Sequence, residues 1–346
     1  MSTAQAGVLA AAALLGLLVV WGSIRMIVPT LRAAEKAQAT NFRGRAVFYG
    51  LGIVWLIWAG CAIIMGVVAA AFARDTVLPL LTLAGPLALV AFALGLIDDA
   101  YGSSADRGFK GHLRAMLKGR LTTGGMKLVG IGLASLVVAL IMSQVAPWAG
   151  PGIPASPLTL RGAGSVLLAG ASIALTSNLF NLLDLRPGRA LKAYGLLLPL
   201  AVVSVTVGLG MSAGGPLRQS SGVIHIAVES IALFLMLLGP LLAVWRYDLG
   251  EEGMLGDSGA NPMGFVIGLM IVSGLPLWGL SAWTALVFGL NLASERVSFS
   301  AVIEGNALLR TMDGWGRLEL DELHADPSVD VGTPQLEEST EIKSGN

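Results

Sequence analysis

Long apolar runs constrain this chain more than any other feature of its sequence. Of its 346 residues, 55% are hydrophobic and only 13% are charged, whereas an ordinary soluble domain has about 25% charged residues. A helix needs about 20 apolar residues to cross the hydrocarbon core of a bilayer. Nine stretches approach this length: residues 6–28, 47–71, 77–97, 126–146, 164–183, 190–211, 222–244, 262–276 and 277–293. The sequence therefore predicts an all-α, polytopic transmembrane helix bundle of about nine (nine to ten) spans, with Gly274 and Pro276 separating the last two.

Lys and Arg are concentrated in alternate connections between these runs, which indicates the orientation of the bundle. Residues 29–46, 98–124 and 184–192 are rich in them, whereas the connections on the other side hold only Arg74, Arg161 or Arg218. Short cytoplasmic loops carry the excess of Lys and Arg. We therefore expect a multi-pass plasma-membrane protein with these three stretches in the cytoplasm and the N-terminus outside.

The composition changes after the last apolar run. Residues 1–293 form the predicted transmembrane domain, and residues 319–346 are rich in Glu, Asp, Ser and Thr. Such a segment cannot bury enough apolar surface to fold alone, so residues 294–346 are predicted to form a largely disordered, acidic cytoplasmic tail. The net charge of the whole chain is zero, which gives no basic surface for a nucleic-acid partner and leaves the lipid bilayer as the expected surrounding.

Four carboxylates stand at the ends of three predicted spans. Asp98 and Asp99 close the third span in GLIDD, Asp184 ends the fifth in SNLFNLLD, and Asp257 follows the seventh in GDSGAN. All three places are cytoplasmic by the charge distribution, so separate helices are expected to bring these groups to one surface. Oxygen ligands of this kind suit Mg²⁺, and paired carboxylates repel each other unless a cation or proton lies between them. The pattern favours an active site over ordinary interfacial residues.

The residues around these carboxylates are suited to handling phosphate. Gly256 allows close backbone approach, and N–H groups at a helix start bind anions. Asn178 and Asn181 are three residues apart and share a helix face, which Asp184 continues toward the cytoplasmic end. Lys127 begins a span behind Thr-Thr-Gly-Gly, where its charge can offset that of a phosphate.

In this order on these helices, GLIDD, SNLFNLLD and GDSGAN resemble the motifs of the polyprenyl-phosphate N-acetylhexosamine-1-phosphate transferases. This superfamily (glycosyltransferase family 4) includes MraY, WecA and TagO, and the resemblance covers roughly residues 40–300. It implies Mg²⁺-dependent transfer of a sugar-1-phosphate from a UDP-sugar to undecaprenyl phosphate, with release of UMP, in the synthesis of a cell-envelope polymer.

The resemblance also implies roles for individual residues. Asp257 and Asp184 would bind Mg²⁺, and Asp98 or Asp99 would act as a base or would orient the lipid phosphate. Asp184 and Lys127 complete the expected catalytic group. The expected substrate-binding residues are Asn178, Asn181, Arg186, Arg189, Gly256 and Ser258.

One segment departs from the family pattern and keeps other functions open. Relatives have Gly-Leu-Asp-Gly after the asparagine motif, whereas this chain has LDLRPGR, which lacks a carboxylate and adds Arg186 and Arg189. The alternative is a catalytically inactive relative that binds polyprenyl phosphate or an envelope-assembly partner. A small-solute transporter is a third class, but its site is expected near the bilayer midplane. The sugar, the polymer and the formation of a homo-oligomer stay open.

Overall fold

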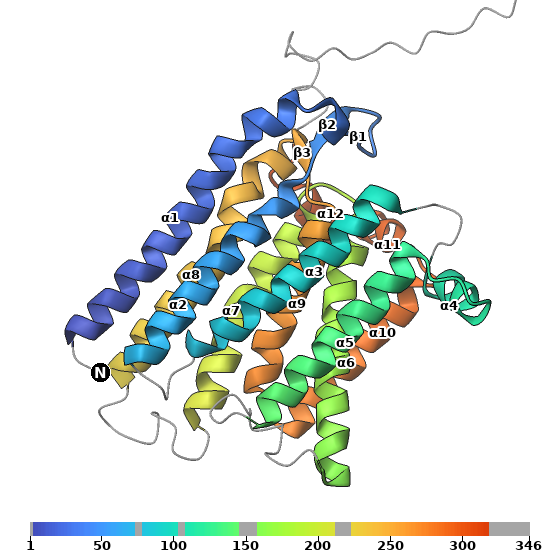
Figure 1. Cartoon of the computed structure of the whole chain (residues 1–346). Helices are drawn as coiled ribbons and strands as arrows, with labels where there is room; N and C mark the ends of the chain where they lie inside the picture. Colours follow the sequence, from blue (N-terminus) through green and yellow to red (C-terminus); the bar gives the residue numbers. More distant parts are fainter. Residues whose placement is uncertain (1–2, 73–77, 103–107, 145–157, 212–222, 318–346) are drawn as a thin grey trace, which may run out of the picture.

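The protein is a bundle of long helices, which we describe from a computed structural model (Figure 1). The structure describes residues 3–72, 78–102, 108–144, 158–211 and 223–317. Within them, the long helices are α1 (Thr3–Ala33), α2 (Val54–Phe72), α3 (Leu81–Tyr101), α5 (Thr123–Gln144), α6 (Leu160–Leu183), α7 (Arg189–Met211), α8 (Val223–Leu249), α9 (Asp257–Gly274) and α10 (Leu277–Ser294). Eight of these, all except α9, are long and apolar enough to cross a membrane. The predicted all-α polytopic bundle is therefore confirmed.

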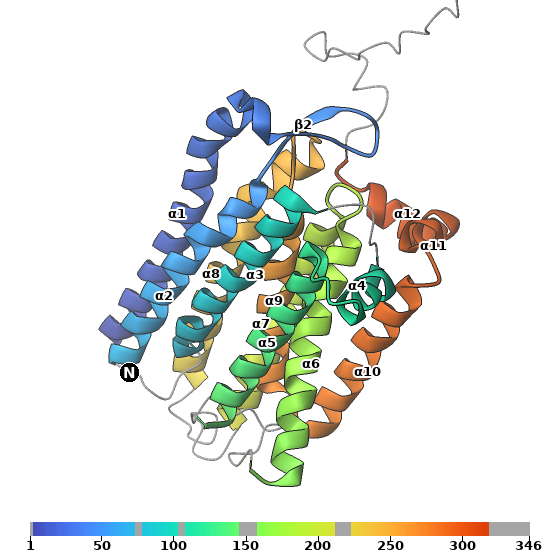
Figure 2. The same ribbon diagram turned by 45° about the vertical axis from the view of Figure 1, so that its right-hand side comes forward.

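Helix α9 differs from the other long helices because it lies in the centre of the bundle (Figures 1 and 2). Every residue from Ser258 to Gly274 is buried, and the helix packs against α3, α6 and α7. Small residues permit this close packing, since a Cβ added to Gly264 would lie 2.6 Å from the carbonyl oxygen of Thr176. The predicted division of the last apolar stretch is confirmed, because α9 ends at Gly274 and α10 begins at Leu277.

A small sheet and several short helices complete the fold. The strands β1 (Gln38–Thr40) and β2 (Ala46–Tyr49) pair antiparallel, and β2 pairs parallel with β3 (Gly253–Met254). The short helices are η1 (Glu35–Ala37), η2 (Leu51–Ile53), η3 (Leu78–Leu80), α4 (Gly108–Leu117), α11 (Phe299–Gly305) and α12 (Ala307–Gly314). All of these elements except η3 lie at the end of the bundle where α5, α7 and α9 begin (Figure 1).

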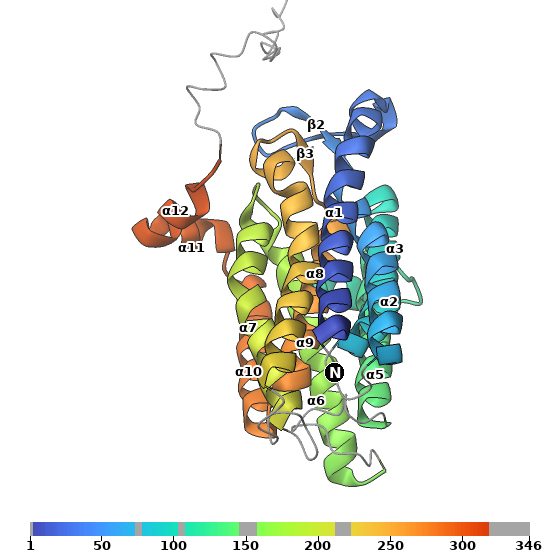
Figure 3. The same cartoon turned by 90° about the vertical axis from the view of Figure 1, so that its left-hand side faces the viewer.

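Two sequence-based boundaries differ from the structure. The stretch 47–71 was expected to be one span, but its first residues form β2, and α2 begins only at Val54. The cause is local: Gly50 has a φ of 110°, which interrupts any helix that would start earlier. The expected tail from residue 294 contains α11 and α12, which project beside α7 (Figure 3). Residues 318–346 lie outside the described residues.

A group of buried aromatic side chains joins α2, α6 and α7. Trp55, Trp58, Phe180 and Tyr194 are fully buried and form a chain of edge-to-face contacts between α2, α6 and α7. The indole of Trp58 donates to a carbonyl oxygen of α8 at 2.8 Å, and the hydroxyl of Tyr194 donates to the next one at 2.7 Å. These hydrogen bonds satisfy the polar atoms of side chains that are otherwise surrounded by apolar groups.

Candidate functional site

Four helices contribute one charged cluster at the end of the bundle that holds the sheet. Asp98 comes from the end of α3, Asn181 from the end of α6, Lys127 from the start of α5 and Asp257 from the start of α9. The ammonium of Lys127 lies 2.8 Å from Asp98 and also forms an ion pair with Asp257. With its amide nitrogen turned toward Asp257, Asn181 donates to that carboxylate and accepts from Lys127 Nζ at 3.2 Å. The expected convergence of these side chains is thus seen in the fold.

Asp99 has a different position from its neighbour Asp98. Its carboxylate accepts hydrogen bonds from the backbone N–H of Asp257 at 2.9 Å and of Ser258 at 2.8 Å. These groups are unsatisfied donors at the start of a helix, where a negative charge is also favoured by the helix dipole. Asp99 therefore caps α9 and fixes the backbone that presents Asp257.

Tyr49 of β2 is a member of the cluster that sequence analysis missed. Its phenol hydrogen-bonds Asp99, and its burial, followed by the charge of Asp99, raises the pKa of the hydroxyl above its usual range. The group therefore stays protonated and donates. A Cβ on Gly256, which has a φ of 69°, would collide with the Tyr49 hydroxyl and lie 3.0 Å from Asp99. Glycine at this position permits the close contact between β2, α3 and α9.

Ser258 was expected to bind substrate, but it faces the protein interior. The residue is buried, and its hydroxyl has no hydrogen-bond partner among the described residues. It packs directly against Gly52, where a Cβ would lie 2.7 Å from the Ser258 carbonyl carbon. Ser258 also packs against Gly95, so its described contacts are with Gly52, Gly95 and, through its backbone N–H, Asp99.

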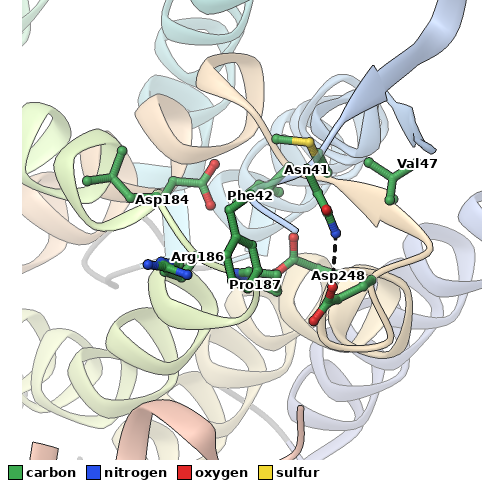
Figure 4. A pocket seen from close by; sticks show the side chains of 12 residues that line it. Asn41, Phe42, Val47, Asp184, Arg186, Pro187 and Asp248 are labelled. Carbon is green, nitrogen blue, oxygen red and sulfur yellow. Dashed lines mark hydrogen bonds between the residues drawn. The ribbon is translucent and has the colours of Figure 1, made fainter. Parts of the chain in front are cut away.

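Asp184 extends the negative charge of the cluster toward a small cavity. It follows the last turn of α6, and the cavity of about 50 Å³ beside it is also lined by Asn41, Phe42, Arg186 and Asp248 (Figure 4). Burial, then the charges of Asp248, Asp257 and Asp99, hold the pKa of Asp184 well above its ordinary value. Excess negative charge thus gathers on this side of the cluster.

A larger, mostly apolar cavity of about 520 Å³ opens on the other side of Lys127. It lies between α5, α6, α9 and α10, and its polar lining residues are Lys127, Asn178, Asn181, Asn261, Asn291, His112, Ser294 and Glu295. Asn178 donates to Asn291 at 2.7 Å, so it contacts α10 instead of the carboxylates. Asn261 donates to the backbone oxygen of Asp257, while its own side-chain oxygen has no protein partner within the described residues. The cavity therefore combines an ammonium, amides and the carboxylate of Glu295 with apolar side chains.

The two arginines of LDLRPGR are engaged by the C-terminal helices. Arg189 is buried and forms two hydrogen bonds with Asp313, at 2.9 and 3.0 Å, and one with Ser300 at 3.0 Å. Arg186 pairs with Glu304 at 3.1 Å and lies 4.2 Å above the ring of Phe42. These residues were expected to bind substrate, and in this structure carboxylates of the chain itself pair with both guanidinium groups.

The carboxylates of the cluster are the groups that could hold Mg²⁺. In the part of the chain that the structure describes, no group of three or more His, Cys, Asp or Glu side chains is placed around one ion position. Mg²⁺ is commonly held by one or two carboxylates, with phosphate oxygens and water filling the other positions. Asp257 and Asp184 are two carboxylates whose charges act on each other, and they are the pair that would hold the ion together with phosphate oxygens and water.

No model of a known protein family matches the chain, and no curated protein is similar to it.

Proposed function

We propose that this protein is a Mg²⁺-dependent phosphoglycosyl transferase that moves a sugar-1-phosphate from a UDP-sugar to undecaprenyl phosphate and releases UMP, in the synthesis of a cell-envelope polymer. The observation that carries the proposal is the position of Lys127. Its ammonium contacts Asp98, Asp257 and Asn181, and it also lines the apolar cavity of about 520 Å³. A phosphate attached to a long apolar chain has matching chemistry at both of these places.

The proposed chemistry needs positioning and charge stabilisation more than covalent assistance from the protein. Asp257 and Asp184 would hold Mg²⁺, which when bound would offset negative charge on the phosphoryl groups. Lys127 would bind a phosphate oxygen, and Asp98 would accept the proton of the lipid phosphate or orient it. Asp99 would act through α9, because both of its oxygens already accept backbone N–H groups.

The amides of the cavity suit the remaining parts of the substrates. Asn181 would position the phosphate side, and Asn178 would contact the ligand from the wall it shares with α10. The free side-chain oxygen of Asn261 would accept a hydrogen bond from a hydroxyl or N–H group of the sugar or nucleotide. The sugar itself stays open.

We place the site on the cytoplasmic face of the plasma membrane. The support is that the described parts of the three Lys- and Arg-rich stretches, residues 29–46, 98–124 and 184–192, lie at the same end of the bundle as the cluster (Figure 1). Positive charge in short loops marks the cytoplasmic side.

The test is UMP release by the purified full-length protein with Mg²⁺, undecaprenyl phosphate and a panel of UDP-sugars. Asp257→Asn should abolish release, because it removes a carboxylate from the proposed metal site while keeping the side-chain volume. Glu252→Gln is a matched control at the same end of the bundle, where Glu252 pairs with Arg32 away from the cluster. Release that survives Asp257→Asn, or that persists after Mg²⁺ is chelated, would contradict the proposal.

A second candidate is a protein that binds polyprenyl phosphate without catalysis. It is favoured by the lack of a group of three metal-ligating side chains among the described residues. The same assay separates the two candidates. Retention of undecaprenyl phosphate with no UMP from any UDP-sugar would favour the binding protein.

A further inference from the structure

A second large recess, of about 1060 Å³, lies between α7, α8 and α12, and it does not include the carboxylate cluster. Its lining combines apolar and basic side chains. The apolar ones are Leu196, Leu241, Trp245, Met312 and Trp315, and the basic ones are Arg43, Lys192 and Arg317.

The apolar wall of this recess is continuous with the lipid-facing surface of α7. Leu196 is 71% exposed although it lines the recess, and Leu200 and Val203 on the next turns of α7 are exposed as well. The rings of Trp245 and Trp315 meet edge to face with their centroids 6.2 Å apart. Tryptophans are enriched where a membrane protein passes from hydrocarbon to water. This side of the recess therefore suits the part of an acyl chain that lies nearest the lipid headgroup.

The other side of the recess carries unbalanced positive charge. The carboxylate of Asp313 is shared by Arg189 and Arg317, and Lys192 donates to the backbone oxygen of Asp313, not to its carboxylate. Asp248 is the other carboxylate whose charge acts on Lys192. Arg43 is paired with Glu251 at 3.3 Å and adds no net charge. The other three basic side chains, Arg189, Lys192 and Arg317, face the carboxylates of Asp313 and Asp248, which leaves one positive charge for an incoming anion.

We propose that this recess binds an anionic phospholipid of the membrane, with its headgroup phosphate at Lys192 and Arg317 and an acyl chain along Leu196 and Trp245. Basic pockets between transmembrane helices on the cytoplasmic side are suited to anionic headgroups. A free phosphate would leave the apolar wall unused, whereas a zwitterionic lipid carries a cationic group that offsets its phosphate and so brings no net negative charge to the recess. The site is separate from the proposed transferase site, and the two proposals can fail independently.

The experiment is native mass spectrometry of the purified full-length protein titrated with phosphatidylglycerol or phosphatidylcholine. The native protein should retain phosphatidylglycerol preferentially. Lys192→Gln should weaken that retention about fivefold, because a basic residue near an anionic lipid contributes on the order of this factor, and it should leave phosphatidylcholine unchanged. Lys192→Arg should restore the preference, since it keeps the charge. Lys118→Gln is the matched control, because Lys118 is an exposed lysine at the same end of the bundle and does not line the recess.

A second variant tests the apolar half of the recess. Trp315→Ala removes part of the wall without changing charge, and it should lower the retention of both lipids while Lys192 maintains the preference. The proposal is overturned if Lys192→Gln leaves the ratio of the two lipids unchanged, or if Trp315→Ala has no effect on either lipid. Displacement of phosphatidylglycerol by excess inorganic phosphate would also overturn it, because the recess would then be a phosphate site.

Discussion

Replacing Lys127 by methionine removes the ammonium between two carboxylates while keeping a side chain of similar length. In the native protein this ammonium lies 2.8 Å from Asp98, pairs with Asp257 and donates to the oxygen of Asn181. After the substitution, the two carboxylates, which also contact each other directly, lose the positive charge that they share. The fold must then protonate one of them or bind a cation from solution.

The size of the effect follows from burial. Removing one partner of a buried ion pair costs about 3–5 kcal/mol, because the remaining charge is left uncompensated. The side chain of Lys127 is 8% exposed, but those of Asp98 and Asp257 are 16% and 27% exposed, so water screens part of the repulsion. We therefore expect Lys127→Met to lower the free energy of unfolding by about 3 kcal/mol, near the lower end of that range.

The assay is equilibrium unfolding of the purified protein in mixed detergent micelles with a chelator present. Lys127→Arg should recover much of the loss because it retains the charge, and Lys118→Met on the exposed surface should stay within about 0.5 kcal/mol of the native protein. Addition of Mg²⁺ should stabilise Lys127→Met more than the native protein, since a divalent cation can replace the missing charge.

Two results would refute this reasoning. One is a loss below about 1 kcal/mol for Lys127→Met, which is the range of an exposed ion pair. The other is an equal loss for Lys127→Arg, which would show that the shape of the side chain matters and its charge does not.

Three further predictions concern residues around the cluster. The pKa of Asp184 is raised above its unfolded value of 3.8, so the folded state binds more protons, and the stability of the protein must fall as the pH rises above that value. With a chelator present, Asp184→Asn should therefore melt at a higher temperature than the native protein at pH 7. The difference in melting temperature should vanish near pH 4. Gly256→Ala should cost about 1–3 kcal/mol of unfolding free energy in equilibrium denaturation, because the residue has a positive φ. Gly289→Ala is the control: no atoms lie within 4 Å of the new Cβ, so this variant should not be destabilised. Arg189→Ala should speed tryptic cleavage within residues 299–317 by at least about tenfold, because it breaks a buried ion pair. Arg186→Ala should change the cleavage rate little, because the partner of Arg186 is 59% exposed. Equal cleavage rates for the two variants would contradict the view that Arg189 holds α11 and α12 in place.

The long apolar runs made the bundle predictable, because length and composition alone decide whether a helix can cross a membrane. The convergence of Asp98, Asp184 and Asp257 was also predictable. The alternation of basic loops put the ends of their helices on one side, and that inference needs no knowledge of which helices are neighbours. The central position of α9 was not predictable in this way, since its burial depends on close packing at Gly264 that hydropathy does not report.

The parts that sequence analysis missed depend on short elements and distant pairing. Tyr49 lies in a four-residue strand whose partners come from residues 38–40 and 253–254, and no local pattern identifies its contact with Asp99. Asp248 had a usable signal, because it follows the predicted span 222–244 on the same side as the other carboxylates. The helices α11 and α12 were not predicted, because the acidic residues that follow them made the whole segment read as disordered. They are held by Asp313, which pairs with Arg189 and Arg317.

The measurement that tests the central claim most directly is the transfer of label from a UDP-sugar, radioactive in the phosphate next to the sugar, into the lipid phase. We expect a pyrophosphate-linked lipid that appears with Mg²⁺ and undecaprenyl phosphate, together with an equal amount of UMP, and that is absent with Asp257→Asn. Bound undecaprenyl phosphate with no label in the lipid from any UDP-sugar would contradict it.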